Sequence, residues 1–306
     1  MRTRAPVLAA LVAASLLLVL AGCGGGGDAQ TSDRPAQGPA PIRLGTKNFT
    51  EQYILGQLYA QTLRAHGIDV ELKNDIGSSE IVDQAMQIGS LDMYPEYTGV
   101  LLSEIAGVSE RPASAKATYD AAEKFERARG YDLLPMTPFS NSNALAVTHE
   151  TAMRYGLRSI GDLAKIHGGA RIAAPPEFRT RFEGLIGLEQ RYGLKARVAA
   201  MPIGEQYRAL KDGVVDAAAV FATDGMLDEG EYVILRDPRN LFSFQNVAPV
   251  VRASVLERTP GLKDAIDPVS AKLTTAAMRK MNTEVDLDDK EPAEVAKAFL
   301  QQEGLL

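Results

Sequence analysis

Hydrophobic residues in the first third of the chain recur with two different periods, which predict helices and strands in turn. In segment 51–65, Leu55 and Leu58 fall on one face of a helix. Thr50 suits the N-cap of this helix and Gly67 its end. The neighbouring segments predict strands at 42–46, 69–73 and 91–94 and a second helix at 80–88.

The second half of the chain repeats this alternation of strands and helices. Its expected strands are 144–148, 170–174, 196–200 and 215–221. Its expected helices are 150–155, 160–167, 181–192 and 205–212, and a final helix is expected at 293–301. Strands that alternate with single helices form parallel pairs through helical crossovers, so the pattern predicts an α/β fold.

One internal correspondence suggests that the two halves are related. Segment 85–92 matches segment 209–216, each a helix end, a glycine stop and a strand that opens with aspartate. The same offset places Tyr97 over Phe221. This match has two interpretations. Either the two lobes are related, or the match is the chance similarity that is common among α/β sequences.

Two similar lobes imply a cleft between them, and ligands of parallel sheets bind outside the carboxyl ends of the strands. Tyr97 and Phe221 fall at such ends, while Lys47 and Arg181 lie near the start of each lobe's first helix. The aromatic pair is suited to hold a flat or cationic ligand. Alternatively, both rings belong to the core, Lys47 is a solvated side chain and Arg181 is the partner of a surface salt bridge.

Composition and charge narrow the function further. The 306 residues carry a net charge of −6, which argues against binding to nucleic acid. The sequence has no phosphate loop, and the spacing of its three histidines suits no metal site. No nucleophile with a paired base stands out, so we expect no enzyme and no cofactor.

The N-terminus is typical of a secreted lipoprotein. Arg2 and Arg4 precede an apolar run that ends in the tetrad Leu-Ala-Gly-Cys at Cys23, which resembles a bacterial lipobox. We expect residues 1–22 to be a signal peptide, Cys23 to carry the lipid and residues 23–41 to be a flexible tether. The alternative is a free cysteine that follows an ordinary signal peptide.

Several motifs together resemble one family, the osmoprotectant-binding lipoproteins of bacterial ABC importers. The motifs are GTKNFTEQYILG at 45–56, YPEYTG at 94–99, ATDG at 222–225, APVVR at 248–252 and VAKAFL at 295–300. The resemblance implies ligands such as glycine betaine, choline, carnitine or proline betaine. It also implies a type-II periplasmic-binding-protein fold, in which two α/β lobes are joined by two crossovers around a central cleft. Lobe 1 would comprise 42–141 plus 246–306, and lobe 2 would comprise 142–245.

The resemblance also assigns roles to residues. Tyr97 and Phe221 match positions of an aromatic cage, whose π faces attract a quaternary ammonium that has no N–H to donate. Lys47 and Arg181 match basic residues that meet the ligand's carboxylate or clamp the closed cleft. Glu51 is interpreted as a structural residue at a helix start.

Two positions depart from the family pattern. Asn143 and Gln245 stand where aromatic residues are usual, so amides replace half of the cage. Phe242, Phe244 or Tyr94 are candidates to compensate for the missing rings. The amides favour a larger or more polar cation, or an amino-acid-like zwitterion, over glycine betaine.

The expected function is therefore that of a solute receptor, lipid-anchored to the outer face of the cytoplasmic membrane. It captures a small quaternary-ammonium or zwitterionic compound and passes it, as a monomer, to an ABC permease and its ATPase. One alternative is the same fold binding a polar amino acid or another nitrogen compound. The other is an extracytoplasmic enzyme on a two-lobe scaffold.

Overall fold

The computed structural model describes residues 40–306, which form one compact unit. The expected signal peptide, the lipidated Cys23 and nearly all of the expected tether lie outside the described residues. Within the described part, no helix combines the length and the apolar character needed to cross a membrane.

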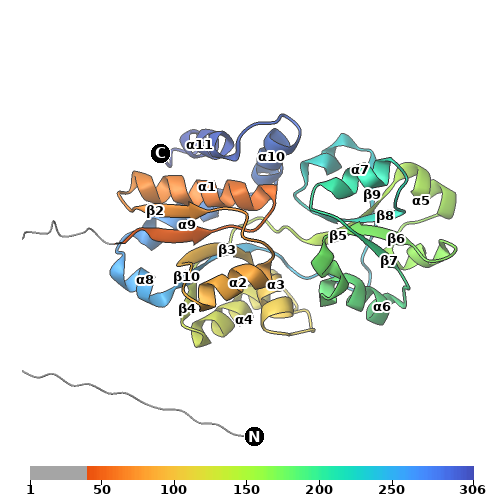
Figure 1. Cartoon of the computed structure of the whole chain (residues 1–306), viewed down its shortest axis with the longest axis horizontal. Coiled ribbons are helices and arrows are strands. Elements are labelled where there is room, and N and C mark those ends of the chain that lie inside the picture. The colour runs from red at the N-terminus through yellow and green to blue at the C-terminus, as the bar shows by residue number, and fades with distance from the viewer. Residues whose placement is uncertain (1–39) are drawn as a thin grey trace, which may run out of the picture. The chain divides into compact units, whose positions relative to one another are not determined.

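Two five-stranded sheets organise the described chain (Figure 1). The first sheet has the order β2-β1-β3-β10-β4, and the second has the order β7-β6-β8-β5-β9. The strands of the first sheet are β1 (Ile42–Gly45), β2 (Val70–Lys73), β3 (Met93–Tyr97), β4 (Tyr131–Leu133) and β10 (Val247–Arg252). Those of the second are β5 (Asn143–Thr148), β6 (Arg171–Ala174), β7 (Arg197–Ala200), β8 (Ala217–Phe221) and β9 (Tyr232–Ile234). We call the parts of the chain around these sheets lobe 1 and lobe 2.

The two sheets share one topology. In lobe 1, β1 is parallel to β2 and β3, whereas β10 is antiparallel to β3. In lobe 2, β6 is parallel to β7 and β8, whereas β5 is antiparallel to β8. This equivalence places the ends of β3 and β8, and so Tyr97 and Phe221, at corresponding points of the two lobes.

The internal correspondence extends to single hydrogen bonds. The carboxylate of Asp92 accepts a hydrogen bond from the backbone N–H of Arg43 at 3.0 Å, and that of Asp216 accepts one from Arg171 at 2.8 Å. This shared hydrogen bond favours two related lobes over a chance similarity between α/β segments.

Helices cover both sheets. Those at 50–65, 79–87, 149–155, 205–211 and 292–302 match predicted segments, whereas those at 98–100, 115–128, 253–258, 262–272 and 275–286 were not predicted. In lobe 1 they are α1 (Thr50–Ala65), α2 (Ser79–Gln87), α3 (Thr98–Val100), α4 (Ala115–Ala128), α8 (Ala253–Arg258), α9 (Leu262–Lys272), α10 (Thr275–Asp286) and α11 (Pro292–Gln302). In lobe 2 they are α5 (His149–Tyr155), α6 (Gly187–Tyr192) and α7 (Glu205–Lys211). Short 3-10 or π-helical turns are η1 (Leu101–Ile105), η2 (Ile160–Lys165), η3 (Pro176–Arg179), η4 (Phe182–Ile186) and η5 (Gly225–Glu229).

Two local predictions were wrong. Thr50 is the first residue of α1 rather than its N-cap, and its hydroxyl donates to Asp286 at 2.6 Å. The helix expected at 181–192 is broken, because Glu183 and Gly184 adopt non-helical backbone angles within η4, ahead of α6. The break turns the Glu183 carboxylate toward groups far along the chain.

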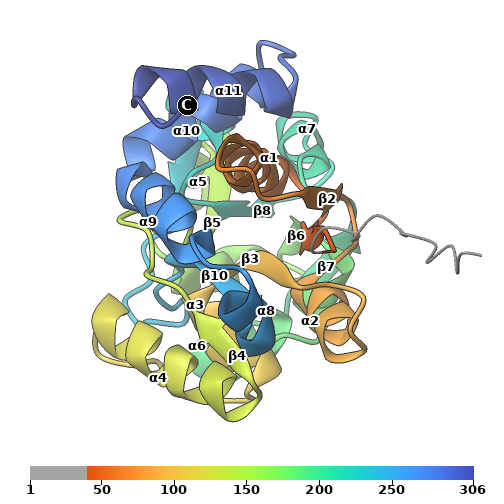
Figure 2. The ribbon, with the colours of Figure 1, turned by 90° about the vertical axis from the view of Figure 1, so that its left-hand side faces the viewer.

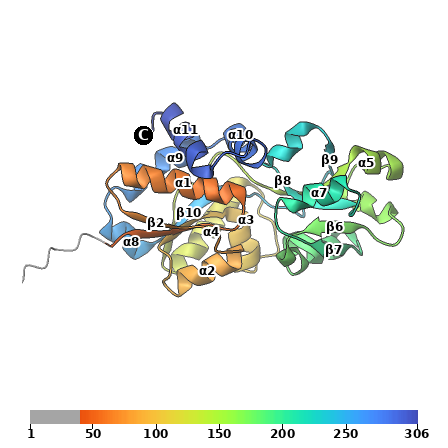
Figure 3. The same ribbon diagram turned by 45° about the horizontal axis from the view of Figure 1, so that its top comes forward.

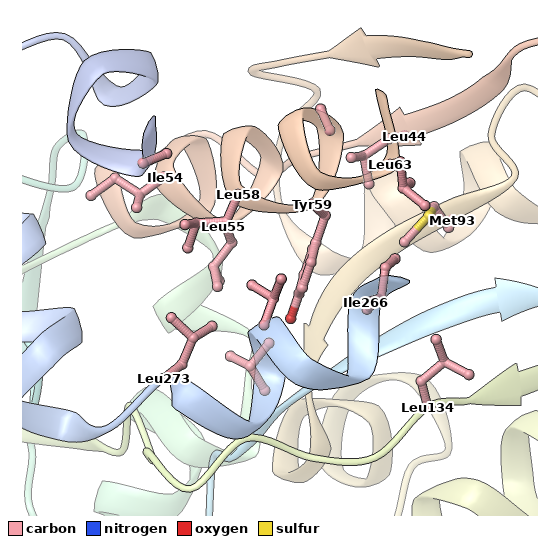
Figure 4. Packing of buried hydrophobic residues seen from close by; sticks show 14 of the residues in the cluster. Leu44, Ile54, Leu55, Leu58, Tyr59, Leu63, Met93, Leu134, Ile266 and Leu273 are labelled. Atoms are coloured by element: carbon pink, nitrogen blue, oxygen red, sulfur yellow. The ribbon is translucent and has the colours of Figure 1, made fainter. Parts of the chain in front are cut away.

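The apolar face of α1 forms the centre of the lobe 1 core (Figure 4). Leu55, Leu58 and Tyr59 are fully buried, and Tyr59 ends in a hydrogen bond with Ser270 of α9 at 3.0 Å. Helices α1, α10 and α11 lie on one side of the first sheet and α2 lies on the other (Figures 2 and 3). The opposite faces of β3 therefore bury different cores, so Tyr97 packs with α1 whereas Tyr94 packs with α2 and α4.

The two crossovers between the lobes pair with each other. Ser140 and Asn246 form an antiparallel bridge, and the N–H of Asn141 donates to the carbonyl of Gln245 at 2.9 Å. Gly99 allows this approach, because a Cβ there would lie 2.7 Å from the carbonyl oxygen of Phe244. The paired crossovers form a short connection about which the lobes are able to hinge.

Candidate functional site

The six residues singled out in the sequence line one cavity between the lobes, which we call the site cavity. They are Lys47, Tyr97, Asn143, Arg181, Phe221 and Gln245. The site cavity has a volume of about 60 Å³. That volume holds a few water molecules and is small for an organic ligand, so the lobes and their side chains are closed around it.

A row of aromatic rings forms one wall of the site cavity. Phe49 stacks on Tyr97 with ring centroids 6.2 Å apart and planes at 19°. It also stacks on Phe221, at 5.8 Å and 14°. Phe49 directly precedes α1 and was not among the predicted site residues, although its aromatic side chain at a helix start facing the cleft was a usable signal.

Lys47 is buried and already paired. Its ammonium donates to the carboxylate of Glu96 and to Ser79 Oγ at 3.1 Å, and it lies 4.1 Å from the centre of the Tyr97 ring. Burial lowers the pKa of Lys47, and the charge of Glu96 opposes that shift. The ammonium is therefore held by lobe 1 itself rather than left free for a ligand.

Arg181 is paired across the cleft. Its guanidinium donates from Nε and Nη2 to the two carboxylate oxygens of Glu80 on α2, at 3.0 and 2.8 Å. Partial burial raises the pKa of Glu80, but the hydrogen bonds and charge of Arg181 outweigh it and bring that pKa to about 2. Of the two predicted roles of Arg181, this geometry matches the clamp of the closed cleft.

A buried carboxylate, Glu183, engages both amides that replace the family's aromatic residues. Its Oε2 accepts from Asn143 Nδ2 at 2.8 Å and from Gln245 Nε2 at 3.1 Å. Its Oε1 accepts from the backbone N–H of Ser243 at 3.0 Å and from the hydroxyl of that residue. Burial raises the pKa of Glu183, and these donors oppose the shift. Four donors fill the acceptor capacity of a carboxylate, so this arrangement suits the ionised form.

A second buried carboxylate, Glu51, links the aromatic wall to the other lobe. Its Oε1 accepts from the hydroxyl of Tyr97 at 2.7 Å and from Asn141 Nδ2 at 2.9 Å. Its Oε2 accepts from the hydroxyl of Thr223 in lobe 2 and from Asn282 Nδ2 at 3.2 Å. Burial raises the pKa of Glu51 while the four donors lower it. The residue thus does more than favour a helix start, because it joins both lobes and a crossover.

The three aromatic residues considered as substitutes for the missing cage positions do not line the site cavity. Tyr94 and Phe242 are buried in separate cores. Phe244 packs under the guanidinium of Arg111, whose carbon lies 4.3 Å from the ring centre. The substitution hypothesis was wrong, and Phe49 supplies the additional ring instead.

The two cations that line the site cavity have ionic partners, whereas its two carboxylates have none among the described residues. Both cations, Lys47 and Arg181, already pair with carboxylates of lobe 1. The lining carboxylates Glu177 and Glu183 form no salt bridge with any described residue. An aromatic wall beside two carboxylates that form no salt bridge is an arrangement that suits an organic cation.

Comparisons with known proteins agree with this geometry. Residues 40–302 match the family described as the substrate binding domain of an ABC-type glycine betaine transport system. A glycine-betaine-binding protein of Pseudomonas aeruginosa is 34% identical over 277 residues, which cover 87% of this chain and 88% of that protein. The glycine betaine-binding protein YehZ of Escherichia coli is 30% identical over 285 residues, with coverage of 88% and 93%.

A solved structure confirms the fold expected from the sequence. The crystal structure of a glycine betaine/carnitine/choline ABC transporter protein aligns with a TM-score of 0.68 and 27% identity, covering 86% of this chain and 99% of that one. The family is one of transport proteins and not one of enzymes. The chain therefore belongs to the family of substrate-binding domains of ABC-type glycine betaine transport systems.

Proposed function

We propose that the site cavity captures a small quaternary-ammonium compound, which the protein then delivers to an ABC permease driven by an ATPase. The observation that carries the proposal is the row of Tyr97, Phe49 and Phe221 beside carboxylates that have no cationic partner. A quaternary ammonium donates no N–H, so aromatic faces select it where ordinary hydrogen bonds do not.

The charge distribution favours a cation without a carboxylate, such as choline, over a betaine. A ligand carboxylate needs an available cation, yet Lys47 is held by Glu96 and Arg181 by Glu80. A betaine therefore binds only at the cost of breaking one of these pairs. Glycine betaine and carnitine are accordingly expected to bind more weakly than choline.

The alternative ligand class, a polar amino acid, receives less support. It was suggested by the amides of Asn143 and Gln245, but the N–H groups of both donate to Glu183. The side-chain oxygen of Gln245, Oε1, also accepts a hydrogen bond from the backbone N–H of Val100 at 3.0 Å. An α-carboxylate would find few unoccupied donors there.

The location of the protein follows from its N-terminus. Residues 1–22 are cleaved, Cys23 carries the lipid and residues 23–41 tether the two lobes to the outer face of the cytoplasmic membrane. The monomer closes its lobes, 42–141 plus 246–306 and 142–245, by hinging at the paired crossovers. Replacing Cys23 by Ser is expected to move the protein from the membrane fraction to the soluble fraction and to remove the lipid mass from the N-terminal peptide.

Ligand identity is tested by thermal shift and calorimetry with choline, glycine betaine, carnitine and polar amino acids. A bound ligand raises the melting temperature with its concentration and is recovered unaltered, whereas an enzyme substrate is consumed. We expect Tyr97→Ala to abolish the shift with choline. Phe125→Ala on α4, a half-buried ring outside the site cavity, is the matched control and keeps the shift. A full choline shift in Tyr97→Ala contradicts the proposal.

A further inference from the structure

A second cavity adjoins the site cavity on the other side of Phe49, and we call it the side chamber. Its volume is about 500 Å³, several times that of the site cavity. Asn48, Phe49, Asn141 and Ile203 line both spaces. Both lobes contribute to its walls, through α1 and α10 of lobe 1 and through α7 and η5 of lobe 2. The side chamber is thus a neighbouring part of the same interlobe space.

Aromatic side chains surround the side chamber. Phe49 and Tyr53 come from the start of α1, whereas Tyr207 and Tyr232 come from lobe 2. The rings of Tyr207 and Tyr232 meet edge to face, with centroids 5.3 Å apart and planes at 63°. The hydroxyl of Tyr207 donates to Asp224 Oδ2 at 2.6 Å, so its ring is held in position.

Two carboxylates without a salt-bridge partner in the described part of the chain line the side chamber, the partly buried Asp224 and the exposed Asp286. Asp224 accepts hydrogen bonds from Tyr207 and from the backbone N–H of Phe221, and Asp286 accepts one from Thr50. Neither carboxylate forms a salt bridge with a described residue. Burial, with added repulsion from Glu51 and Asp286, raises the pKa of Asp224 to about 7, although Tyr207 opposes the shift.

The basic residues in the lining of the side chamber are exposed side chains of α7. Arg208 and Lys211 line the rim of the side chamber, and Lys211 forms an ion pair with Glu231 at 3.2 Å. In the part of the chain that is described, no group of three or more His, Cys, Asp or Glu is arranged to hold a metal ion. The negative charge among the rings is therefore suited to an organic cation rather than to a metal.

Two buried amides beside the side chamber each have one polar atom without a described partner. Gln206 is 1% exposed and Asn282 is 3% exposed, and both line the side chamber. Gln206 Nε2 and Asn282 Oδ1 have no hydrogen-bond partner among the described residues. Both atoms have almost no accessible surface, so a ligand or water in the side chamber completes their bonds only if neighbouring side chains move.

We propose that the side chamber binds an organic ammonium group, so that one extended cation occupies the site cavity and the side chamber together. The inference rests on the proposed function, because the first cationic group of such a ligand lies at the Tyr97 wall. The ligand class is an organic cation with a second positive or N–H-bearing end, which Asp224 and Asp286 receive.

The test uses calorimetry with tetramethylammonium and with a series of bis(trimethylammonium)alkanes of increasing linker length. The site cavity, about 60 Å³ in this structure, has to widen to admit tetramethylammonium, which is too short to reach the side chamber as well. A dication with a linker of the right length reaches both spaces. We expect an optimum length at which the dication binds at least about tenfold more tightly than tetramethylammonium, as for a second cation–π and charge contact.

Asp286→Asn is the matched variant, because the amide still accepts from Thr50 but carries no charge. It is expected to reduce the dication's advantage about threefold or more while leaving the affinity for tetramethylammonium unchanged. Asp264→Asn on α9, an exposed aspartate outside the side chamber, controls for net charge and keeps the advantage. Asp224→Asn removes the charge of the other carboxylate and is expected to reduce the dication's advantage in the same way.

The outcomes separate the two proposals. If tetramethylammonium binds but no linker length improves the affinity, or if the gain persists in both Asp286→Asn and Asp224→Asn, the side chamber proposal is overturned and the proposed function stands. If tetramethylammonium does not bind, the proposed function fails and the side chamber proposal fails with it.

Discussion

Arg181 of lobe 2 and Glu80 of lobe 1 form a two-pronged hydrogen-bonded ion pair across the cleft, at 3.0 and 2.8 Å. The side chains are 20% and 41% exposed, so solvent screens the pair and its contribution is about 1 kcal/mol. Because the partners belong to different lobes, that energy favours lobe closure more than the folding of either lobe.

Glu80→Gln is expected to weaken the binding of choline about threefold to tenfold, since the closed form loses a charged contact. Calorimetry at low and high salt checks this, because screening reduces the difference between the variant and the native protein. The partner variant Arg181→Gln is expected to behave alike. An affinity that is unchanged at low salt in Glu80→Gln refutes the clamp role.

Gly225→Ala is expected to obstruct lobe closure. A Cβ at Gly225 of η5 would lie 2.8 Å from Cα and 3.0 Å from the backbone nitrogen of Thr283 on α10, and backbone atoms yield little. We expect the Kd for choline to rise about tenfold, with a smaller effect on thermal stability because the clash lies between lobes. Gly161→Ala is the control, because its nearest neighbour is 3.5 Å away in Tyr192. Native affinity in Gly225→Ala is the opposing result.

Tyr97→Phe separates the ring from its hydroxyl. The variant keeps the π face but leaves Glu51 without one of four donors, which is expected to lower the free energy of unfolding by about 1–2 kcal/mol. Denaturant unfolding measures this loss, and the affinity for choline should change less than about threefold. Tyr155→Phe on α5 has no side-chain hydrogen bond to lose among the described residues and serves as the control. Equal stabilities of the two variants contradict the role of Glu51.

Asp224 is expected to make stability fall as the pH rises toward neutrality. Burial lifts the pKa of this carboxyl from 3.8 to about 7 in the folded protein, so the folded form favours the protonated group. Its contribution is complete below the unfolded value and is lost as the pH rises through about 7. Asp224→Asn keeps an acceptor for Tyr207 but cannot ionise, so its stability relative to the native protein should increase between about pH 5 and pH 8, by on the order of 1–3 kcal/mol. If the difference in stability between Asp224→Asn and the native protein does not change with pH, this explanation is excluded.

Much of the architecture is readable from local patterns. The period of the apolar residues locates most strands and helices, because each period is a property of a few consecutive residues. The matched segments around Gly89 and Gly213 reveal two similar halves, and both glycines adopt the positive φ that ends a helix. At the start of α1 and at the break at Glu183, distant partners outweigh local preference. The strands β4, β9 and β10 and the helices α3, α4, α8, α9 and α10 were not predicted.

The candidate site contains residues that local sequence patterns do not predict. Its six predicted residues do line one cavity, but Phe49, Glu51 and Glu183 were not predicted as members. Glu51 meets Asn282, which is 231 positions away, and no short-range pattern signals such a partner.

The amino-acid sequence by itself determined the alternating elements, the duplicated halves and the corresponding strand ends that carry Tyr97 and Phe221. Only the tertiary structure decided that Lys47 is neutralised by Glu96 and Arg181 by Glu80, at separations of 49 and 101 residues. The physical reason is that periodicity and capping act within a few residues, whereas the partner of a buried charge is set by which distant segments the packed lobes bring together.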